Sequence, residues 1–198
     1  MRPAPQFTAF PEARRQLLPR QARARGFTLI ELVAVLVMVG LITTFAASRF
    51  FQRDTFDARG FADQATNIVR YGQKLAVAQN RAVFVRIDAN SVALCFDAAC
   101  SAANRVLPPT GSNSGSNETL QYCNGQRNWL CEGRPASVAL STVPANTPGF
   151  YFDALGRPYA LANVFPAPST FPARLALRIA GDGAARNIMV EGETGYVY

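Results

Sequence analysis

Residues 27–47, FTLIELVAVLVMVGLITTFAA, decide the fold because they form one unbroken apolar segment with a single charge, Glu31, and no proline. As an α-helix, a segment of this length extends about 31 Å, close to the thickness of the hydrocarbon core of a bilayer. It is too long for an ordinary secretory signal, and no clear A-x-A cleavage site follows it. A buried helix of a soluble protein is the alternative, but such helices rarely follow a strongly basic segment. We therefore expect a transmembrane helix over residues 27–47.

The positive charge of the chain is concentrated ahead of this segment. The 198 residues carry 20 Lys and Arg against 13 Asp and Glu, which gives a net charge of +7. Residues 1–26 hold six arginines and one acidic residue, whereas the other 172 residues hold 14 basic and 12 acidic ones. Because basic residues beside a membrane helix stay in the cytoplasm, we expect a cytoplasmic N-terminus and an exported C-terminal domain. The basicity thus reflects membrane topology rather than binding to nucleic acid.

Glu31 is an unusual residue inside an apolar helix. A carboxylate at this depth raises the free energy of membrane insertion by about 2.5–3.5 kcal/mol, and such residues usually have a partner. A protonated Glu31, or one whose carboxylate reaches the interface, is the structural alternative. A functional role requires a cation at the same depth, and the unprocessed chain does not offer one.

Residues 26–32, Gly-Phe-Thr-Leu-Ile-Glu-Leu, follow a basic leader and open the apolar helix, and they resemble the prepilin motif of type IV pilins and type II secretion pseudopilins. The resemblance implies that a prepilin peptidase of the bacterial inner membrane cleaves after Gly26 and that Phe27 is then N-methylated. It also implies that Glu31 pairs with the Phe27 amine of a neighbouring subunit during filament assembly. Such a pair would remove two charges together from a medium of low dielectric constant.

The same resemblance implies the location and partners of the chain. It predicts a single-pass protein of the inner membrane with a periplasmic C-terminal domain, which is incorporated into a pilus or pseudopilus. The implied partners are the prepilin peptidase and methyltransferase, other pilin or pseudopilin subunits, and inner-membrane lipid.

After the apolar segment the sequence changes its periodicity. Residues 48–80 continue as an amphipathic helix whose apolar residues recur at steps of three and four, as at Phe61, Ala65, Ile68 and Val69. Alternating residues then predict strands joined by turns. The strands are expected at 83–87, 91–96, 137–143, 149–153, 174–180 and 187–191, with a further edge at 195–198.

One long helix followed by an antiparallel meander is an α+β arrangement with the helix laid across the sheet, and it is also the pilin architecture. The expected domains are a cleaved leader (1–26), a transmembrane helix (27–47), a periplasmic amphipathic helix (48–80) and an antiparallel β domain (81–198).

Two shorter segments resemble particular subgroups of the family. Residues 152–158, FDALGRP, are similar to the F-x-x-x-G-R segment of pseudopilin H and FimT-like proteins. A strand that ends in a glycine turn, with an ion pair between Asp153 and Arg157, is the alternative interpretation. Residues 95–100 and 193–197 are similar to minor subunits of the mannose-sensitive haemagglutinin pilus.

The four cysteines, Cys95, Cys100, Cys123 and Cys131, all lie in the part expected to be exported, where an oxidising compartment favours disulfides. Three pairings are possible. The local scheme, Cys95 with Cys100 and Cys123 with Cys131, closes loops small enough to form during export. A zinc site is the rival, but the spacings fit no common zinc motif.

The composition also bears on function. The chain has no histidine, which removes catalytic Ser-His-Asp and Cys-His arrangements, and it shows no phosphate-binding loop. We therefore expect no enzyme, no cofactor and no metal site, but a structural minor pilin or pseudopilin. The alternative is a minor pilin that binds DNA for uptake. A DNA-binding surface needs positive charge. The last 20 residues do not favour it, because they contain one basic residue, Arg186, and three acidic residues, Asp182, Glu191 and Glu193.

Overall fold

The computed structural model describes residues 27–164, 166–181 and 183–198, with the backbone but not the side chains of residues 44–55. The predicted leader, including Gly26, lies outside the described residues. The chain divides into two units, residues 1–43 and 44–198.

Helix α1, Leu29–Gln79, contributes residues to both units. Within the second unit one stripe of α1 is buried, at spacings of three and four residues that match the helical period. The amphipathic pattern predicted over residues 48–80 is therefore confirmed from residue 56 onward, whereas the side chains of residues 48–55 lie outside the described ones. The buried residues are Ala58, Phe61, Ala62, Ala65, Ile68, Val69, Gly72 and Ala76.

A five-stranded antiparallel sheet has the order β3-β2-β1-β5-β6. Strands β1 and β2 form a hairpin in which Val85 lies opposite Leu94, and β1 pairs on its other side with β5, where Val85 lies opposite Phe150. The strands are β1 (Val83–Ile87), β2 (Ser91–Cys95), β3 (Cys131–Gly133), β5 (Gly149–Phe152) and β6 (Pro158–Ala160).

A separate three-stranded sheet consists of β4 (Ala139–Val143), β7 (Arg174–Gly181) and β8 (Ala184–Glu191), in the order β4-β7-β8. The C-terminal residues extend it, because Val197 bridges to Val190, as expected for an edge at 195–198. The expectation of a single meander is wrong. Although β4 and β5 are consecutive in the chain, β5 pairs with β1 and β4 pairs with β7. The strands therefore form two sheets.

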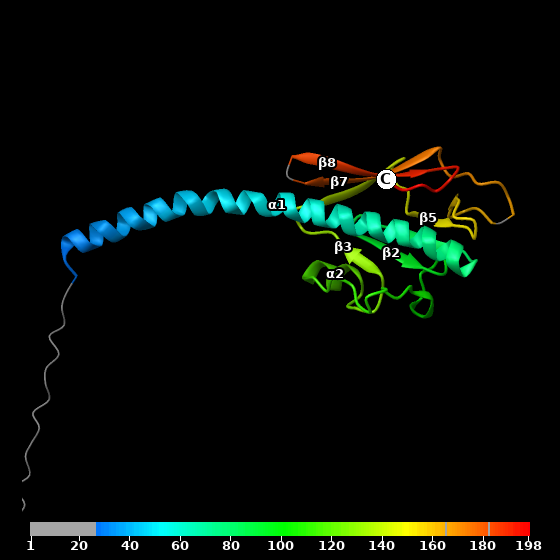
Figure 1. Cartoon of the computed structure of the whole chain (residues 1–198), viewed down its shortest axis with the longest axis horizontal. Helices are drawn as coiled ribbons and strands as arrows, with labels where there is room; N and C mark the ends of the chain where they lie inside the picture. Colours follow the sequence, from blue (N-terminus) through cyan, green and yellow to red (C-terminus); the bar gives the residue numbers. More distant parts are fainter. Residues whose placement is uncertain (1–26, 165, 182) are drawn as a thin grey trace, which may run out of the picture. The chain divides into compact units, whose positions relative to one another are not determined.

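The two sheets share one core with the packed stripe of α1. In Figure 1, β7 and β8 lie to one side of α1, and β2, β3 and α2 lie to the other. A Cβ on Gly72 would lie 3.0 Å from Cδ2 of Leu94, so the glycine permits the close approach of α1 to β2. The α+β class, with a long helix against antiparallel strands, is confirmed.

Polar side chains of α1 also fasten distant parts of the chain. The amide of Gln73 donates hydrogen bonds to the carbonyl oxygens of Gly156 and Thr194, both at 3.0 Å. Arg70 donates from Nε to the carbonyl oxygen of Val197 at 3.1 Å. The β5–β6 turn and the C-terminal segment are thus both anchored to the helix.

Two short helical elements were not expected from the sequence. A 3-10 turn, η1, spans Ala102–Asn104, and helix α2 spans Asn117–Tyr122. The side chain of Ser116 caps α2 by accepting a hydrogen bond from the backbone N–H of Thr119 at 3.0 Å.

Candidate functional site

The start of α1 is held by a reciprocal pair of hydrogen bonds between Thr28 and Glu31. The hydroxyl oxygen of Thr28 accepts from the backbone N–H of Glu31 at 3.3 Å, and Oε2 of Glu31 accepts from the backbone N–H of Thr28 at 3.5 Å. This is a capping box, which satisfies two amides that a helix start would otherwise leave free. Glu31 thereby has a structural role in addition to the role expected from the motif.

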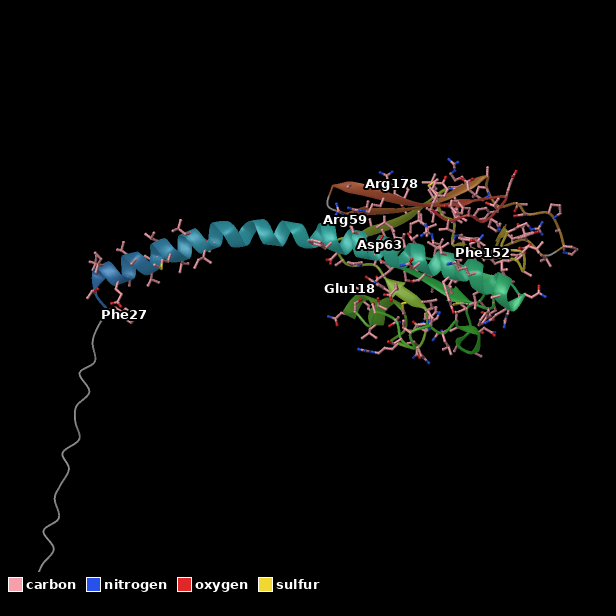
Figure 2. The ribbon with its side chains drawn as sticks, viewed as in Figure 1. Phe27, Arg59, Asp63, Glu118, Phe152 and Arg178 are labelled. Carbon is pink, nitrogen blue, oxygen red and sulfur yellow. A yellow bond between two sulfur atoms is a disulfide. The ribbon has the colours of Figure 1, made fainter. Side chains whose placement is uncertain are left out.

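The capping box places a carboxylate at the positive end of the helix dipole, where negative charge is stabilised. The amide that Glu31 binds belongs to Thr28, the residue directly after Phe27. Phe27 itself precedes the helix (Figure 2). Its side chain is 81% exposed. The geometry thus brings the predicted assembly residue close to the predicted new N-terminus, whereas Gly26 lies outside the described residues.

The part of α1 that follows the capping box is apolar on all its sides. Among residues 29–43 no face of the helix is predominantly polar, and each large apolar side chain is exposed by about half or more. A contiguous apolar surface of this kind, exposed among residues 27–43, is typical of a site that contacts a membrane or another protein. These residues are Leu29, Ile30, Leu32, Val33, Val35, Leu36, Val37, Met38, Val39, Leu41 and Ile42. In the part of the chain that the structure describes, no helix meets the length and hydropathy of a membrane span.

The four cysteines form two disulfides in the second unit, Cys95–Cys100 and Cys123–Cys131, which is the local pairing. Their Cα atoms are 5.2 and 5.9 Å apart. The two disulfides adjoin one apolar cluster with Trp129, whose ring N–H donates to the carbonyl oxygen of Leu94 at 3.0 Å. They therefore fasten the two ends of the long connection between β2 and β3. Among the described residues, no group of three or more His, Cys, Asp or Glu could hold a metal ion.

The FDALGRP segment forms a tight turn closed by an ion pair. Arg157 donates from Nη2 to Oδ2 of Asp153 at 2.8 Å, while Oδ1 of Asp153 accepts from the backbone N–H groups of Leu155 and Arg157. Hydrogen bonding and charge attraction from Asp153 raise the pKa of Arg157. Gly156 occupies the left-handed region, with φ at +78°, which favours glycine. The expectation of a turn ion pair is confirmed.

A buried carboxylate, Glu132 on β3, escaped the sequence analysis. Only 6% of its surface is exposed, and it accepts hydrogen bonds from the backbone and hydroxyl of Ser114 at 2.8 and 2.5 Å. It also accepts from the hydroxyl of Thr119 at 2.8 Å. A glutamate beside a cysteine in a strand of three residues gives no periodic signal, so the sequence alone does not mark it.

The comparison with protein families matches residues 21–47 to the prokaryotic N-terminal methylation motif. The match agrees with the prepilin motif expected at residues 26–32. The match covers the end of the basic leader, the residues of the capping box and the apolar segment.

No curated protein sequence matches the chain. Two crystal structures of the type IV minor pilin FimU of Pseudomonas aeruginosa are similar to it. One is 16% identical over 75% of this chain and 90% of that chain, with a TM-score of 0.46. The other is 14% identical over 71% and 90%, with a TM-score of 0.45.

Proposed function

We propose that the chain is a structural subunit of a filament assembled from the bacterial inner membrane, as a minor pilin of a type IV pilus or a pseudopilin of a type II secretion system. The observation that carries the proposal is the methylation motif at residues 21–47, which coincides with the capped start of α1. The chain acts in it as a building element rather than as an enzyme.

Processing would complete the site at the start of α1. Hydrolysis of the peptide bond after Gly26 frees the amine of Phe27, which carries a positive charge even when methylated. The Glu31 carboxylate already lies one residue away from this position, at the amide of Thr28. Pairing the carboxylate with the amine of an adjacent subunit offsets the unfavourable burial of each charge alone. An out-of-register neighbour would leave Glu31 unpaired, so the pair specifies the stagger between subunits.

The apolar surface of the first unit would be covered both in the membrane, before assembly, and in the filament, after assembly. Before assembly, bilayer lipid would cover the side chains of residues 27–47, with the N-terminus in the cytoplasm. After assembly, the same side chains of neighbouring subunits would cover one another. The second unit, with its two disulfides, would lie in the periplasm, where an oxidising environment maintains them.

The test is the intact mass and N-terminal sequence of the protein isolated from membranes with and without a prepilin peptidase. The proposal predicts a chain that begins at methylated Phe27 and forms only when the peptidase is present. An uncut chain, or one cut beyond Ala47, would overturn it.

A second measurement separates processing from assembly. Glu31→Ala is expected to leave cleavage intact and to reduce incorporation into filaments, because the amine of the neighbour loses its partner. Glu193→Ala, an exposed glutamate of the C-terminal turn, is the matched control and is expected to incorporate normally.

A further inference from the structure

Cysteines of the two disulfides lie on neighbouring strands, where they can compete for partners. Cys95 ends β2, and Cys131 begins β3 opposite Ala93. Because residues two positions apart share a face of a strand, Cys95 and Cys131 are diagonal neighbours on one face of the sheet. Such neighbours lie about 7–8 Å apart, a gap that strands still adjusting during folding can close with a disulfide. The pairing of Cys95 with Cys131 therefore competes with the native one.

A compact turn organised by Asp97 lies inside the loop that Cys95 and Cys100 close. Oδ1 of Asp97 accepts a hydrogen bond from the backbone N–H of Ser101 at 3.0 Å, and Oδ2 accepts one from the Ser101 hydroxyl at 2.7 Å. Oδ2 also accepts from the side-chain amide of Asn104 at 3.2 Å. The backbone carbonyl oxygen of Asp97 accepts from the N–H of Cys100 at 3.2 Å. One aspartate thus binds both Cys100 and the residue that follows it.

The base of the same loop is closed by contacts other than the disulfide. Cys95 and Arg105 form a β-bridge, and the backbone N–H of Phe96 donates to the carbonyl oxygen of Asn104 at 2.6 Å. The guanidinium carbon of Arg81 lies 3.9 Å from the centroid of the Phe96 ring. None of these contacts uses a sulfur atom. The loop can therefore close while both of its cysteines are still thiols.

Cys100 differs from the other cysteines in its exposure and its backbone. It is half-buried, whereas Cys95, Cys123 and Cys131 are fully buried. An oxidant in solution therefore reaches the sulfur of Cys100 most easily. Cys100 also has a φ of +55°, a left-handed conformation that residues other than glycine adopt rarely and that neighbouring contacts must hold. The hydrogen bonds of Asp97 supply such contacts.

We propose that Asp97 directs the pairing of Cys95 with Cys100 by closing their loop before the disulfide forms. The oxidant is a disulfide-bearing molecule, such as glutathione disulfide or a dithiol oxidoreductase. The Cys100 thiolate attacks the disulfide of the oxidant and displaces one of its thiolates, and the Cys95 thiolate then attacks the Cys100 sulfur and displaces the other. Two electrons and two protons pass from the cysteines to the oxidant, which ends as two thiols. Cys123 and Cys131 are then left to pair with each other.

The charge of Asp97 is suited to this role. Hydrogen bonding from the Ser101 side chain lowers the pKa of Asp97 from its ordinary value of 3.8. Free cysteines have a pKa of about 8.5, so the carboxylate is ionised wherever thiolates are present to react. The turn therefore keeps its acceptor oxygens throughout the pH range of disulfide formation.

Oxidative refolding of the full chain tests the proposal. The purified chain is reduced and unfolded, folded in detergent with reduced and oxidised glutathione, and its disulfides are mapped by mass spectrometry over time. In the wild type, the bond between Cys95 and Cys100 is expected to form first. Asp97→Ala is expected to form this bond about fivefold more slowly, because the loop loses its hydrogen bonds, and to accumulate the bond between Cys95 and Cys131.

Asp88→Ala is the matched control, because Asp88 makes the same kind of turn between β1 and β2. Its Oδ1 accepts from the backbone N–H groups of Asn90 and Ser91, each at 2.7 Å, and its Oδ2 accepts from the Ser91 hydroxyl at 2.9 Å. That turn contains no cysteine, so native pairing is expected. Wild-type pairing and rate in Asp97→Ala, or the same mispairing in both variants, would show that the fold as a whole selects the pairs and that the proposal is wrong.

A second measurement examines the local pair without competition. The double variant Cys123→Ser/Cys131→Ser keeps only this pair, and its equilibrium with glutathione gives the effective concentration of one thiol at the other. Adding Asp97→Ala is expected to lower that concentration about fivefold, whereas adding Asp88→Ala should change it by less than about twofold. Equal values for the two would contradict the role of Asp97. Neither measurement requires a processed chain or a filament, so its failure leaves the proposed function untouched.

Discussion

The two described stretches of α1 are both rich in apolar residues, and residues 56–79 pack against the sheets of their own unit. Residues 29–43 present apolar side chains in every direction, and the large ones remain exposed. Residues 56–79 confine their buried side chains to one stripe, which two sheets cover. The difference shows that apolar content alone does not form a core. A stripe that matches the helical period can be buried by one domain, whereas a helix apolar on all sides needs lipid or other chains around it.

Phe61 and Phe56 offer the strongest test of this contrast, since both lie on α1 five positions apart. Phe61 is 2% exposed and Phe56 is 68% exposed. Phe61→Ala is expected to lower the free energy of unfolding by about 3–5 kcal/mol, because it leaves a cavity between α1 and the sheets. Phe56→Ala should change it by less than about 0.5 kcal/mol. Urea unfolding of the full chain in detergent measures both, and equal effects would contradict the assignment of the packed stripe.

Substitutions at two glycines of the same helix are expected to change the free energy of unfolding by less, and in opposite directions. A Cβ at Gly72 would meet Leu94, whereas one at Gly60 meets no atom within 4 Å. Gly72→Val is expected to destabilise the second unit by about 1–3 kcal/mol through overpacking. Gly60→Val should stabilise it by a few tenths of a kcal/mol (~0.3), the difference in helix propensity. Thermal unfolding of the two variants side by side decides whether the close approach of α1 to β2 is as tight as described.

The capping box allows a local test at the other end of α1. Thr28→Ala removes the hydroxyl that accepts from Glu31, at an expected cost of about 0.5–1 kcal/mol at the helix start. Amide hydrogen exchange at Glu31 and Leu32 should then be about two- to fivefold faster. Thr43→Ala is the matched control, because the Thr43 hydroxyl donates to the carbonyl oxygens of Val39 and Gly40 within the helix. Unchanged exchange in Thr28→Ala would rule out the capping box.

The smallest effect is expected where the C-terminal segment joins β8. A hydrogen bond from the hydroxyl of Tyr198, at 2.7 Å, and one from Arg174, at 2.9 Å, lower the pKa of Glu191 from its ordinary value of 4.5. Because the pKa of Glu191 is lower in the folded chain than in the unfolded chain, this group stabilises the fold at pH values above its pKa in the unfolded chain. That stabilisation is lost as the pH falls through the pKa of the folded chain. The difference in unfolding free energy between the wild type and Glu191→Gln should therefore shrink on acidification below pH 4.5. A constant difference would mean that these contacts do not hold the segment.

Regular patterns in the sequence predicted the helix and most strands. The stripe at Phe61, Ala65 and Ile68 is buried as expected, and the strand at 83–87 has the predicted bounds. Strands β3 and β6 were missed because each has three residues, too few for an alternating pattern, and because Gly133 and Pro158 are typical of turns.

The division into two sheets could not be predicted, because it depends on which distant strands pair. The pairing of β1 with β5 joins residues more than 60 positions apart, and local periodicity contains no information on it. At the candidate site the motif pointed to Phe27 and Glu31. The hydrogen bonds between Glu31 and Thr28 could also have been predicted, since a threonine three residues before a glutamate, ahead of an apolar run, is the pattern of a capping box.

The side chain of Gln73 has a consequence for how the second unit opens. Its single amide holds the β5–β6 turn of one sheet and the turn after β8 of the other. Separation of either sheet from α1 breaks a hydrogen bond that the Gln73 side chain donates, either to Gly156 or to Thr194. A force applied to the C-terminal segment would therefore also act on the five-stranded sheet through Gln73. The two sheets would then unfold together rather than one after the other.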